Sequence, residues 1–214
     1  NREGRVRIGS LFSGVGGLEL GLEWAGVGHT VWQVEREPFC RDVLAQHWPD
    51  VKRYDDVCTV GAHNLEPVDV ICGGFPCQDI SYAGKGAGLS GARSGLWYEF
   101  ARIIGEMGPR YVVVENVAAL LRRGMGEVLG TLSDLGYDAE WDIVSARDVG
   151  APHLRRRVFI VAYNRSLRAS RGSQESVQGK SSFSWCEDVR GVEDLRGRPT
   201  IPPPIFRGTR DGIP

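Results

Sequence analysis

The feature that most constrains this chain is a regular alternation of short apolar segments with segments of helical periodicity. Apolar segments typical of buried strands occur at residues 6–12, 30–35, 51–54, 68–74 and 111–114. Apolar residues at helical spacing occupy residues 18–25, 38–48, 96–107 and 125–135, and two further strands are predicted at 140–145 and 158–163. This alternation predicts an α/β fold with an open, mostly parallel sheet covered on both faces.

Unusual residues follow five of the predicted strands. These are Phe12–Gly17, Glu35, Asp56, Pro76–Cys77 and Glu115–Asn116. In an open parallel sheet, ligands bind in the crevice beyond the carboxyl ends of the strands. The sequence therefore predicts one functional rim that carries all five segments.

Composition limits the classes of protein to consider. The 214 residues are 42% hydrophobic, which is enough for one well-buried domain, and no apolar run is long enough to span a membrane. No secretory leader is visible, and five cysteines without C-x-x-C spacing argue against a disulfide scaffold and a zinc site. We therefore expect a reducing compartment, no metal and no membrane partner.

A glycine turn, Gly14-Val15-Gly16-Gly17, follows the first predicted strand and allows a ligand to approach the backbone closely. A dinucleotide fingerprint would need a third glycine where Glu19 stands, and an acid at a helix N-terminus disfavours pyrophosphate. We expect a nucleoside cofactor without phosphates, with Glu35 accepting hydrogen bonds from the ribose and Asp56-Val57 holding the adenine. The alternative is a tight turn with a purely structural role.

Cys77 is the candidate nucleophile, because Gly73-Gly74 and Pro76 place it at the end of a strand. A reactive thiolate needs cationic neighbours, and Arg155-Arg156-Arg157 enter a later predicted strand. Since strand side chains alternate, Arg155 and Arg157 should share one face. The alternatives are a core cysteine, a solvated arginine face and a capping role for Glu115.

Four motifs together resemble the DNA cytosine-5 methyltransferases of bacterial or phage type. They are Phe12-Ser13-Gly14-Val15-Gly16-Gly17, Gly74-Phe75-Pro76-Cys77-Gln78, Glu115-Asn116-Val117 and Arg155-x-Arg157, within residues 6–163. The resemblance implies a Rossmann-like sheet of the class I S-adenosylmethionine-dependent type. It also implies restriction-modification as the setting, double-stranded DNA as partner, a monomer, and the cytoplasm of a bacterial or phage-infected cell.

The resemblance also implies roles for individual residues. Cys77 would attack C6 of a flipped cytosine, Glu115 would contact N3 and the exocyclic amine, and Arg155 and Arg157 would bind O2 and keep the thiol anionic. Residues 83–95 would close over the base. S-adenosylmethionine would lie against Phe12, Ser13, Gly14, Val15, Gly16, Gly17, Glu35, Arg36, Asp56, Val57 and Pro76.

The sequence departs from the family pattern at three places. His153 replaces a usual glutamine, and Arg36 replaces an apolar or aromatic residue beside the adenine. Residues 1–163 would form the catalytic and cofactor-binding domain, and the Pro/Ser/Arg-rich residues 164–214 a short, partly disordered remnant of the target-recognition region. Because the family's closing Gly-Asn segment is missing, we expect a truncated chain with weakened cofactor affinity. We also expect poor sequence specificity, because residues 164–198 are too few and too polar to build a large base-reading domain.

Three other functions remain open from the sequence. An RNA cytosine-5 methyltransferase shares the fold, but its usual Cys-Phe-Thr motif is absent. A catalytically impaired, DNA-binding remnant is the second, and a nicotinamide-dependent dehydrogenase, disfavoured by Glu19, is the third.

Overall fold

The computed structural model describes residues 6–76 and 95–166. Seven strands form one sheet: β1 (Arg7–Leu11), β2 (His29–Val34), β3 (Lys52–Tyr54), β4 (Val70–Gly73), β5 (Tyr111–Val117), β6 (Tyr137–Ser145) and β7 (Arg156–Asn164). The α-helices are α1 (Gly17–Trp24), α2 (Pro38–His47), α4 (Gly95–Met107), α5 (Leu120–Arg123) and α6 (Met125–Asp134), and two 3-10 helices are η1 (Val57–Thr59) and η3 (Ala146–Val149).

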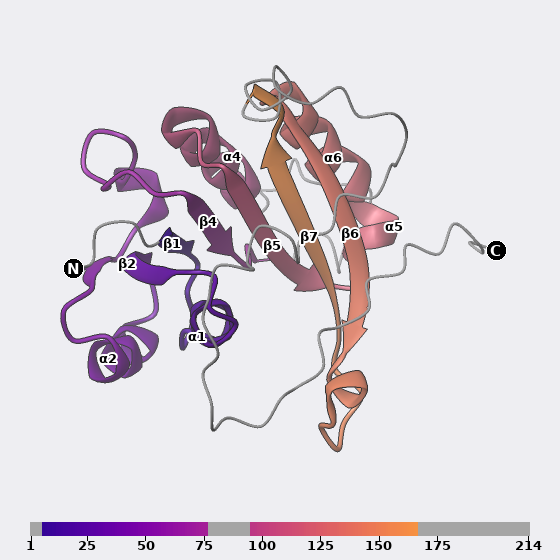
Figure 1. The fold of residues 1–214 in the computed structure, drawn as a ribbon, viewed down its shortest axis with the longest axis horizontal. Helices are drawn as coiled ribbons and strands as arrows, with labels where there is room; N and C mark the ends of the chain where they lie inside the picture. Colours follow the sequence, from indigo (N-terminus) through magenta and orange to yellow (C-terminus); the bar gives the residue numbers. More distant parts are fainter. Residues whose placement is uncertain (1–5, 77–94, 167–214) are drawn as a thin grey trace.

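The strand order is β3-β2-β1-β4-β5-β7-β6 (Figure 1). The first five strands in this order are parallel, whereas β7 runs antiparallel to both β5 and β6. The reversal follows from the connection, because β6 and β7 are joined only by η3 and a short turn. The predicted α/β fold with a mostly parallel sheet is confirmed.

The sheet has an apolar core on each face. One face packs β-strand residues such as Ile71 and Val112 against Phe100 and Ile104 of α4 and Leu132 of α6. The opposite face packs a smaller cluster, Ile8, Val70, Cys72 and Val113, against Leu18 and Leu22 of α1. Helices on both faces leave the carboxyl ends of the parallel strands as the natural place for a site.

Trp32 and Gly9 show how closely β1 and β2 pack. The buried Trp32 ring lies over Gly9, where an added Cβ would lie only 2.0 Å from Cζ2 of the indole. The indole Nε1 donates to the backbone oxygen of Glu66 at 2.9 Å. Gly9 therefore cannot carry a side chain unless Trp32 moves. This close contact fixes the positions of β1 and β2 relative to each other.

The predicted elements agree with the structure within a few residues, with two differences. Glu115 and Asn116 lie inside β5, not after it, because β5 pairs with β7 as far as Val117. The short helix α5 was not predicted, since four residues are too few to show helical periodicity. No helix in residues 6–76 or 95–166 is long and apolar enough to cross a membrane.

Candidate active site at the carboxyl rim of the sheet

The glycine turn leaves β1 through an unusual backbone. Phe12 has φ 55°, a conformation rare for a residue with a side chain, and Gly14 and Gly16 have φ 55° and 86°. Ser13 N–H donates to Val34 O at 3.1 Å, which ties the turn to the end of β2. Positive φ at a non-glycine residue persists only where the surroundings enforce it, so this turn is a built feature of the fold.

One side of the turn is closed and the other is open. A Cβ on Gly16 would lie 2.4 Å from the Trp48 ring, whereas a Cβ on Gly14 or Gly17 would meet nothing within 4 Å. Val15 is exposed beside this open side. A ligand can therefore reach the backbone at Gly14 and Gly17 without displacing side chains.

Glu35 lies directly after β2 and is hydrogen-bonded to the turn. Its Oε2 accepts from Gly14 N–H at 2.7 Å, and its Oε1 accepts from Glu37 N–H at 2.8 Å. Arg36 next to it is exposed, and Arg41 donates to the backbone oxygens of Glu35 and Arg36 at 3.0 and 2.6 Å. The carboxylate is fixed in place, and its remaining lone pairs can accept from a ligand.

Asp56 and Val57 form the third part of this half of the rim. The Asp56 carboxylate caps η1 by accepting from Cys58 N–H at 2.9 Å, and the Asp56 residue stays exposed. Val57 is buried at 5% exposure. Arg102 of α4 donates to Val57 O and Val60 O at 3.2 and 2.9 Å, so this turn is clamped to a helix distant in sequence.

These residues fit a nucleoside cofactor. The open backbone at Gly14 and Gly17 admits a ligand, Glu35 offers a fixed carboxylate for hydroxyl groups, and exposed Asp56 offers an acceptor for an amino group. Among the described residues, no group of three or more His, Cys, Asp or Glu side chains could hold a metal ion.

The end of β4 is held against the end of β5. Asn116 Nδ2 donates to Phe75 O at 3.1 Å, and a Cβ on Gly74 would lie 3.0 Å from Oε2 of Glu115. Pro76 is the last described residue of this segment, and Cys77, which is bonded to it, lies outside the described residues. The segment that leads to Cys77 therefore runs beside Glu115.

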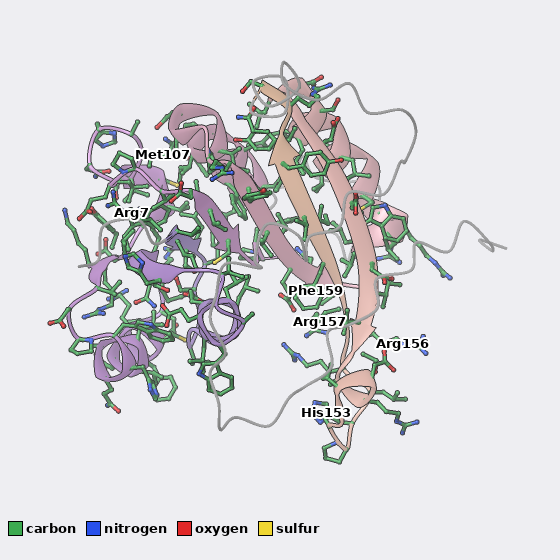
Figure 2. All side chains as sticks on the ribbon, viewed as in Figure 1. Arg7, Met107, His153, Arg156, Arg157 and Phe159 are labelled. Atoms are coloured by element: carbon green, nitrogen blue, oxygen red, sulfur yellow. The ribbon has the colours of Figure 1, made fainter. Side chains whose placement is uncertain are left out.

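Glu115 forms an ion pair with Arg157, with Oε1 and Nε 2.8 Å apart and both side chains about one quarter exposed at 28% and 22%. The pairing follows from register, since Val117 lies opposite Arg157 and Glu115 opposite Phe159, which places all four on one face. Figure 2 shows Arg157 and Arg156 extending from β7 on different sides. Arg155 precedes β7 and is exposed, with no contact to Glu115.

A family model for C-5 cytosine-specific DNA methylases matches residues 6–198, most of the chain. The chain belongs to this family. The methylase family match extends past residue 163, where the motif resemblance ends, and includes residues outside the described part of the structure.

Individual relatives agree with the methylase assignment. The type II methyltransferase M2.BsuMI of Bacillus subtilis is 34% identical over 97% of this chain and 58% of its own length. M.Sau3AI of Staphylococcus aureus is also 34% identical, over 82% of this chain and 48% of its own. A prophage-encoded E. coli protein, solved as a candidate DNA modification methyltransferase, superimposes with a TM-score of 0.63 at 29% identity, over 76% of this chain and 48% of that one. The chain thus spans about half the length of these relatives.

Two features of this methylase were not found from sequence. Arg102 looked like one more charge on an amphipathic helix, and only the structure places it against η1. Glu19 was interpreted only as an acid at a helix N-terminus, and the structure shows that it is fully buried near Ser10, Ser13 and Gln33. Helical spacing places Glu19 three residues before Leu22, which packs against the sheet, but spacing alone does not indicate that the carboxyl group is buried.

Proposed function

We propose that residues 1–163 are the catalytic and cofactor-binding part of a DNA cytosine-5 methyltransferase. The reaction would transfer a methyl group from S-adenosylmethionine to C5 of a cytosine in double-stranded DNA, through a covalent bond between Cys77 and C6. The observation that carries this proposal is the Glu115–Arg157 ion pair, which lies beside the Gly74–Pro76 segment to which Cys77 is bonded, in a chain of the methylase family.

Cytosine C5 is a poor nucleophile, so the enzyme must first activate the ring. The Cys77 thiolate adds to C6, the C5=C6 electron pair moves into the ring, and N3 takes up a proton through Glu115. C5 of the resulting enamine would then form a bond to the methyl carbon of S-adenosylmethionine, whose S–CH₃ bond breaks and which leaves as S-adenosylhomocysteine. Loss of the C5 proton to a base restores the C5=C6 bond, expels Cys77 as thiolate, and N3 gives its proton back.

Glu115 and Arg157 have complementary tasks in this scheme. Glu115 contacts N3 and the exocyclic amine, while Arg157, with Arg155 near it in the chain, binds O2 and stabilises the thiolate. The 2.8 Å contact holds the two charged groups ready on one face of β5 and β7 before a base arrives. The target cytosine must leave the duplex stack, because C6 is inaccessible inside it.

S-adenosylmethionine supplies the methyl group when bound. The turn Phe12–Gly17 would receive it over the open backbone of Gly14 and Gly17, with Glu35 on the ribose hydroxyls. Asp56 would accept from the adenine amino group, Val57 and Arg36 would lie against the ring, and Pro76 would border the methyl donor.

A fluorinated substrate tests the proposal. With S-adenosylmethionine, a pool of duplexes carrying 5-fluorocytosine in randomised flanks should form a covalent adduct on a denaturing gel, because fluorine at C5 blocks the final elimination. Cys77→Ser should abolish the adduct. Glu115→Gln should slow its formation by about 10²–10⁴-fold, the range typical of a lost acid–base group.

Cys40→Ser is the matched control, since it removes a different thiol, one that is partly exposed, and should leave adduct formation unchanged. An adduct that survives Cys77→Ser, or no adduct with the wild-type chain, would contradict the proposal. Methyl transfer to tRNA but not to duplex DNA would move the assignment to the RNA enzyme.

A further inference from the structure

The turn between β6 and β7 extends past the rest of the sheet. We call residues 145–157 the hairpin tip; it contains η3 and the first two residues of β7. Figure 1 shows it projecting beyond the ends of the other strands, and Figure 2 places His153 near its far end. The catalytic scheme above uses Arg155 and Arg157 of this segment and leaves the rest of the tip unexplained.

The hairpin tip is strongly basic in an otherwise acidic structure. It holds four arginines and one aspartate, a net charge of 4 − 1 = +3. The remaining residues of 6–76 and 95–166 hold ten Lys/Arg and eighteen Asp/Glu, a net charge of 10 − 18 = −8. Such a local reversal of sign is typical of a surface that meets an anion.

Three of the four arginines at the tip lack an acidic partner. Arg157 pairs with Glu115, but the guanidinium groups of Arg147, Arg155 and Arg156 make no hydrogen bond or ion pair with any other residue of the described segments. The one acid, Asp148, accepts from Ser145 N–H at 2.9 Å in a capping box. Within the described segments, the positive charge of the tip is therefore not neutralised.

Two apolar side chains lie among these arginines. Val149 is 62% exposed and Leu154 57% exposed. Exposed apolar groups between unpaired cations match a ligand that alternates apolar and anionic groups. The deoxyribose-phosphate backbone has this composition, whereas ribose carries an additional 2′-hydroxyl.

The hairpin tip lies close to Glu115, so a DNA backbone whose target base reaches Glu115 also comes close to the tip. Arg157 lies opposite Val117, so the tip begins where the strand carrying Glu115 ends. Leu154 is three residues from Arg157, so the two lie at most roughly 10 Å apart at ~3.4 Å per residue. A DNA duplex carries one negative charge per ~1.7 Å of its axis, so a base delivered to Glu115 brings phosphates within this reach.

We infer that the hairpin tip binds the deoxyribose-phosphate backbone beside the target nucleotide. Arg147 and Arg156 contact phosphates, and Val149 and Leu154 pack on deoxyribose. The inference rests on the proposed function for the identity of the nucleic acid. It assigns to β6 and β7 a DNA-holding role that is separate from the catalytic ion pair.

The salt dependence of DNA binding tests the proposed phosphate contacts of Arg147 and Arg156. Binding of a labelled mixed-sequence duplex to the full chain is followed by fluorescence anisotropy at increasing KCl. The double variant Arg147→Gln/Arg156→Gln should bind roughly tenfold more weakly at low salt, and the slope of log K against log[KCl] should flatten by about 2, one for each phosphate contact.

The matched control is Arg7→Gln/Lys52→Gln, which removes the same charge away from the tip. Arg7 begins β1 and lies far from the hairpin in Figure 2, and Lys52 begins the edge strand β3. This control should keep the wild-type slope. An equal flattening in both double variants would reduce the effect to net charge, and an unchanged slope in the tip variant, or no duplex binding by the wild type, would overturn the inference.

The proposed contacts of Val149 and Leu154 with deoxyribose predict a different change in DNA binding. Val149→Ser/Leu154→Ser should weaken duplex binding severalfold without changing the salt slope. The wild-type preference for DNA over an RNA duplex of the same sequence should fall. Tighter tip-dependent binding to RNA than to DNA would contradict the assignment to deoxyribose.

The 5-fluorocytosine adduct separates this inference from the proposed function. An adduct with an unchanged salt slope would refute the hairpin role and leave the methyltransferase intact. A flattened salt slope in the tip variant, without an adduct in the wild type, would support the hairpin role and refute the methyltransferase.

Discussion

At the scale of single residues, the least expected feature is the carboxyl group of Glu19. It is fully buried, and neither Oε atom has a hydrogen-bond partner among the described residues; both polar atoms of the Gln33 side chain are likewise unpaired. Burial raises the pKa of Glu19, while nearby Ser10, Ser13 and Gln33 oppose the shift. The carboxyl lies in the first turn of α1, beneath the turn proposed to hold the cofactor.

Replacing Glu19 with glutamine should stabilise the protein at alkaline pH. The folded state holds the Glu19 proton more tightly than the unfolded state does, so the wild type loses stability as pH rises through the folded pKa. Glutamine is neutral at every pH. We expect Glu19→Gln to raise the free energy of unfolding by about 1 kcal/mol at pH 8 and by almost nothing near pH 4.

Urea unfolding at both pH values measures this difference. Glu19→Ala serves as a comparison, because it leaves a cavity and should destabilise the protein at both pH values. A gain from Glu19→Gln of equal size at pH 4 and pH 8 would show that the carboxyl does not titrate in the folded state.

The sequence could predict that Glu115 and Arg157 belong to one site, but it could not predict that Glu19 is buried. Alternation along the strand predicted that Arg155 and Arg157 would share a face, and the resemblance assigned Glu115 and Arg157 to one site without predicting the ion pair between them. Arg155, expected on the same face, lies outside the strand and is exposed, because β7 begins only at Arg156. The burial of Glu19 depends on how α1 docks on the sheet, a tertiary property that composition and spacing do not encode.

At the scale of elements, α4 and η1 are joined by one side chain. Arg102 forms ion pairs with Glu99 and Glu106, each at 2.7 Å, and donates to two carbonyl oxygens at the η1 turn. Glu106 in turn accepts from Ala62 N–H at 3.0 Å, and the hydrogen bond from Arg102 is the main reason its pKa lies below the usual value. Arg102 therefore positions the turn proposed to hold adenine.

Arg102→Ala should weaken binding of S-adenosylhomocysteine about tenfold, because the carbonyls of η1 lose their charged donor and the turn loses its anchor. Isothermal titration measures the affinity, and DNA affinity should stay unchanged. Arg165→Ala is the control, since Arg165 also bonds a backbone oxygen but lies at the end of β7, away from η1. Equal losses in both variants would indicate general destabilisation.

Most elements were predictable because their patterns are local. The apolar strands and the apolar face of α4 follow from periodicities that the structure reproduces. The reversed direction of β7 and the extension of β5 to Val117 depend on pairing between distant segments. Those pairings decide that Glu115 and Asn116 belong to the strand, with their side chains on opposite faces.

At the scale of the whole molecule, the sheet brings together the half proposed to bind the cofactor and the half proposed to be catalytic. The glycine turn, Glu35 and Asp56 follow β1, β2 and β3, while Gly74 follows β4 and Glu115 belongs to β5. The halves meet where Leu11 of β1 lies opposite Gly73 of β4. The close approach is visible at Gly73, where a Cβ would lie 2.3 Å from Leu11 O.

Ligand binding at this junction should stabilise the whole chain. S-adenosylhomocysteine at a hundred times its dissociation constant contributes ~2.7 kcal/mol, which corresponds to a rise in Tm of about 5–10 °C for a chain of this size. Glu35→Ala should remove most of the rise. NAD should give none, and a shift with NAD that exceeds the shift with S-adenosylhomocysteine would favour the dehydrogenase reading. Differential scanning fluorimetry measures all three.

The place of β7 has a consequence for synthesis. It is the last strand made in the described part of the chain, yet it lies between β5 and β6, and β6 has no other neighbour in the sheet. A chain emerging from the ribosome leaves β6 unpaired until β7 emerges, and the pairing of the two strands is complete only at residue 164. Arg157 arrives with that same strand, so the nascent protein acquires its Glu115–Arg157 ion pair only when the last described strand joins the sheet.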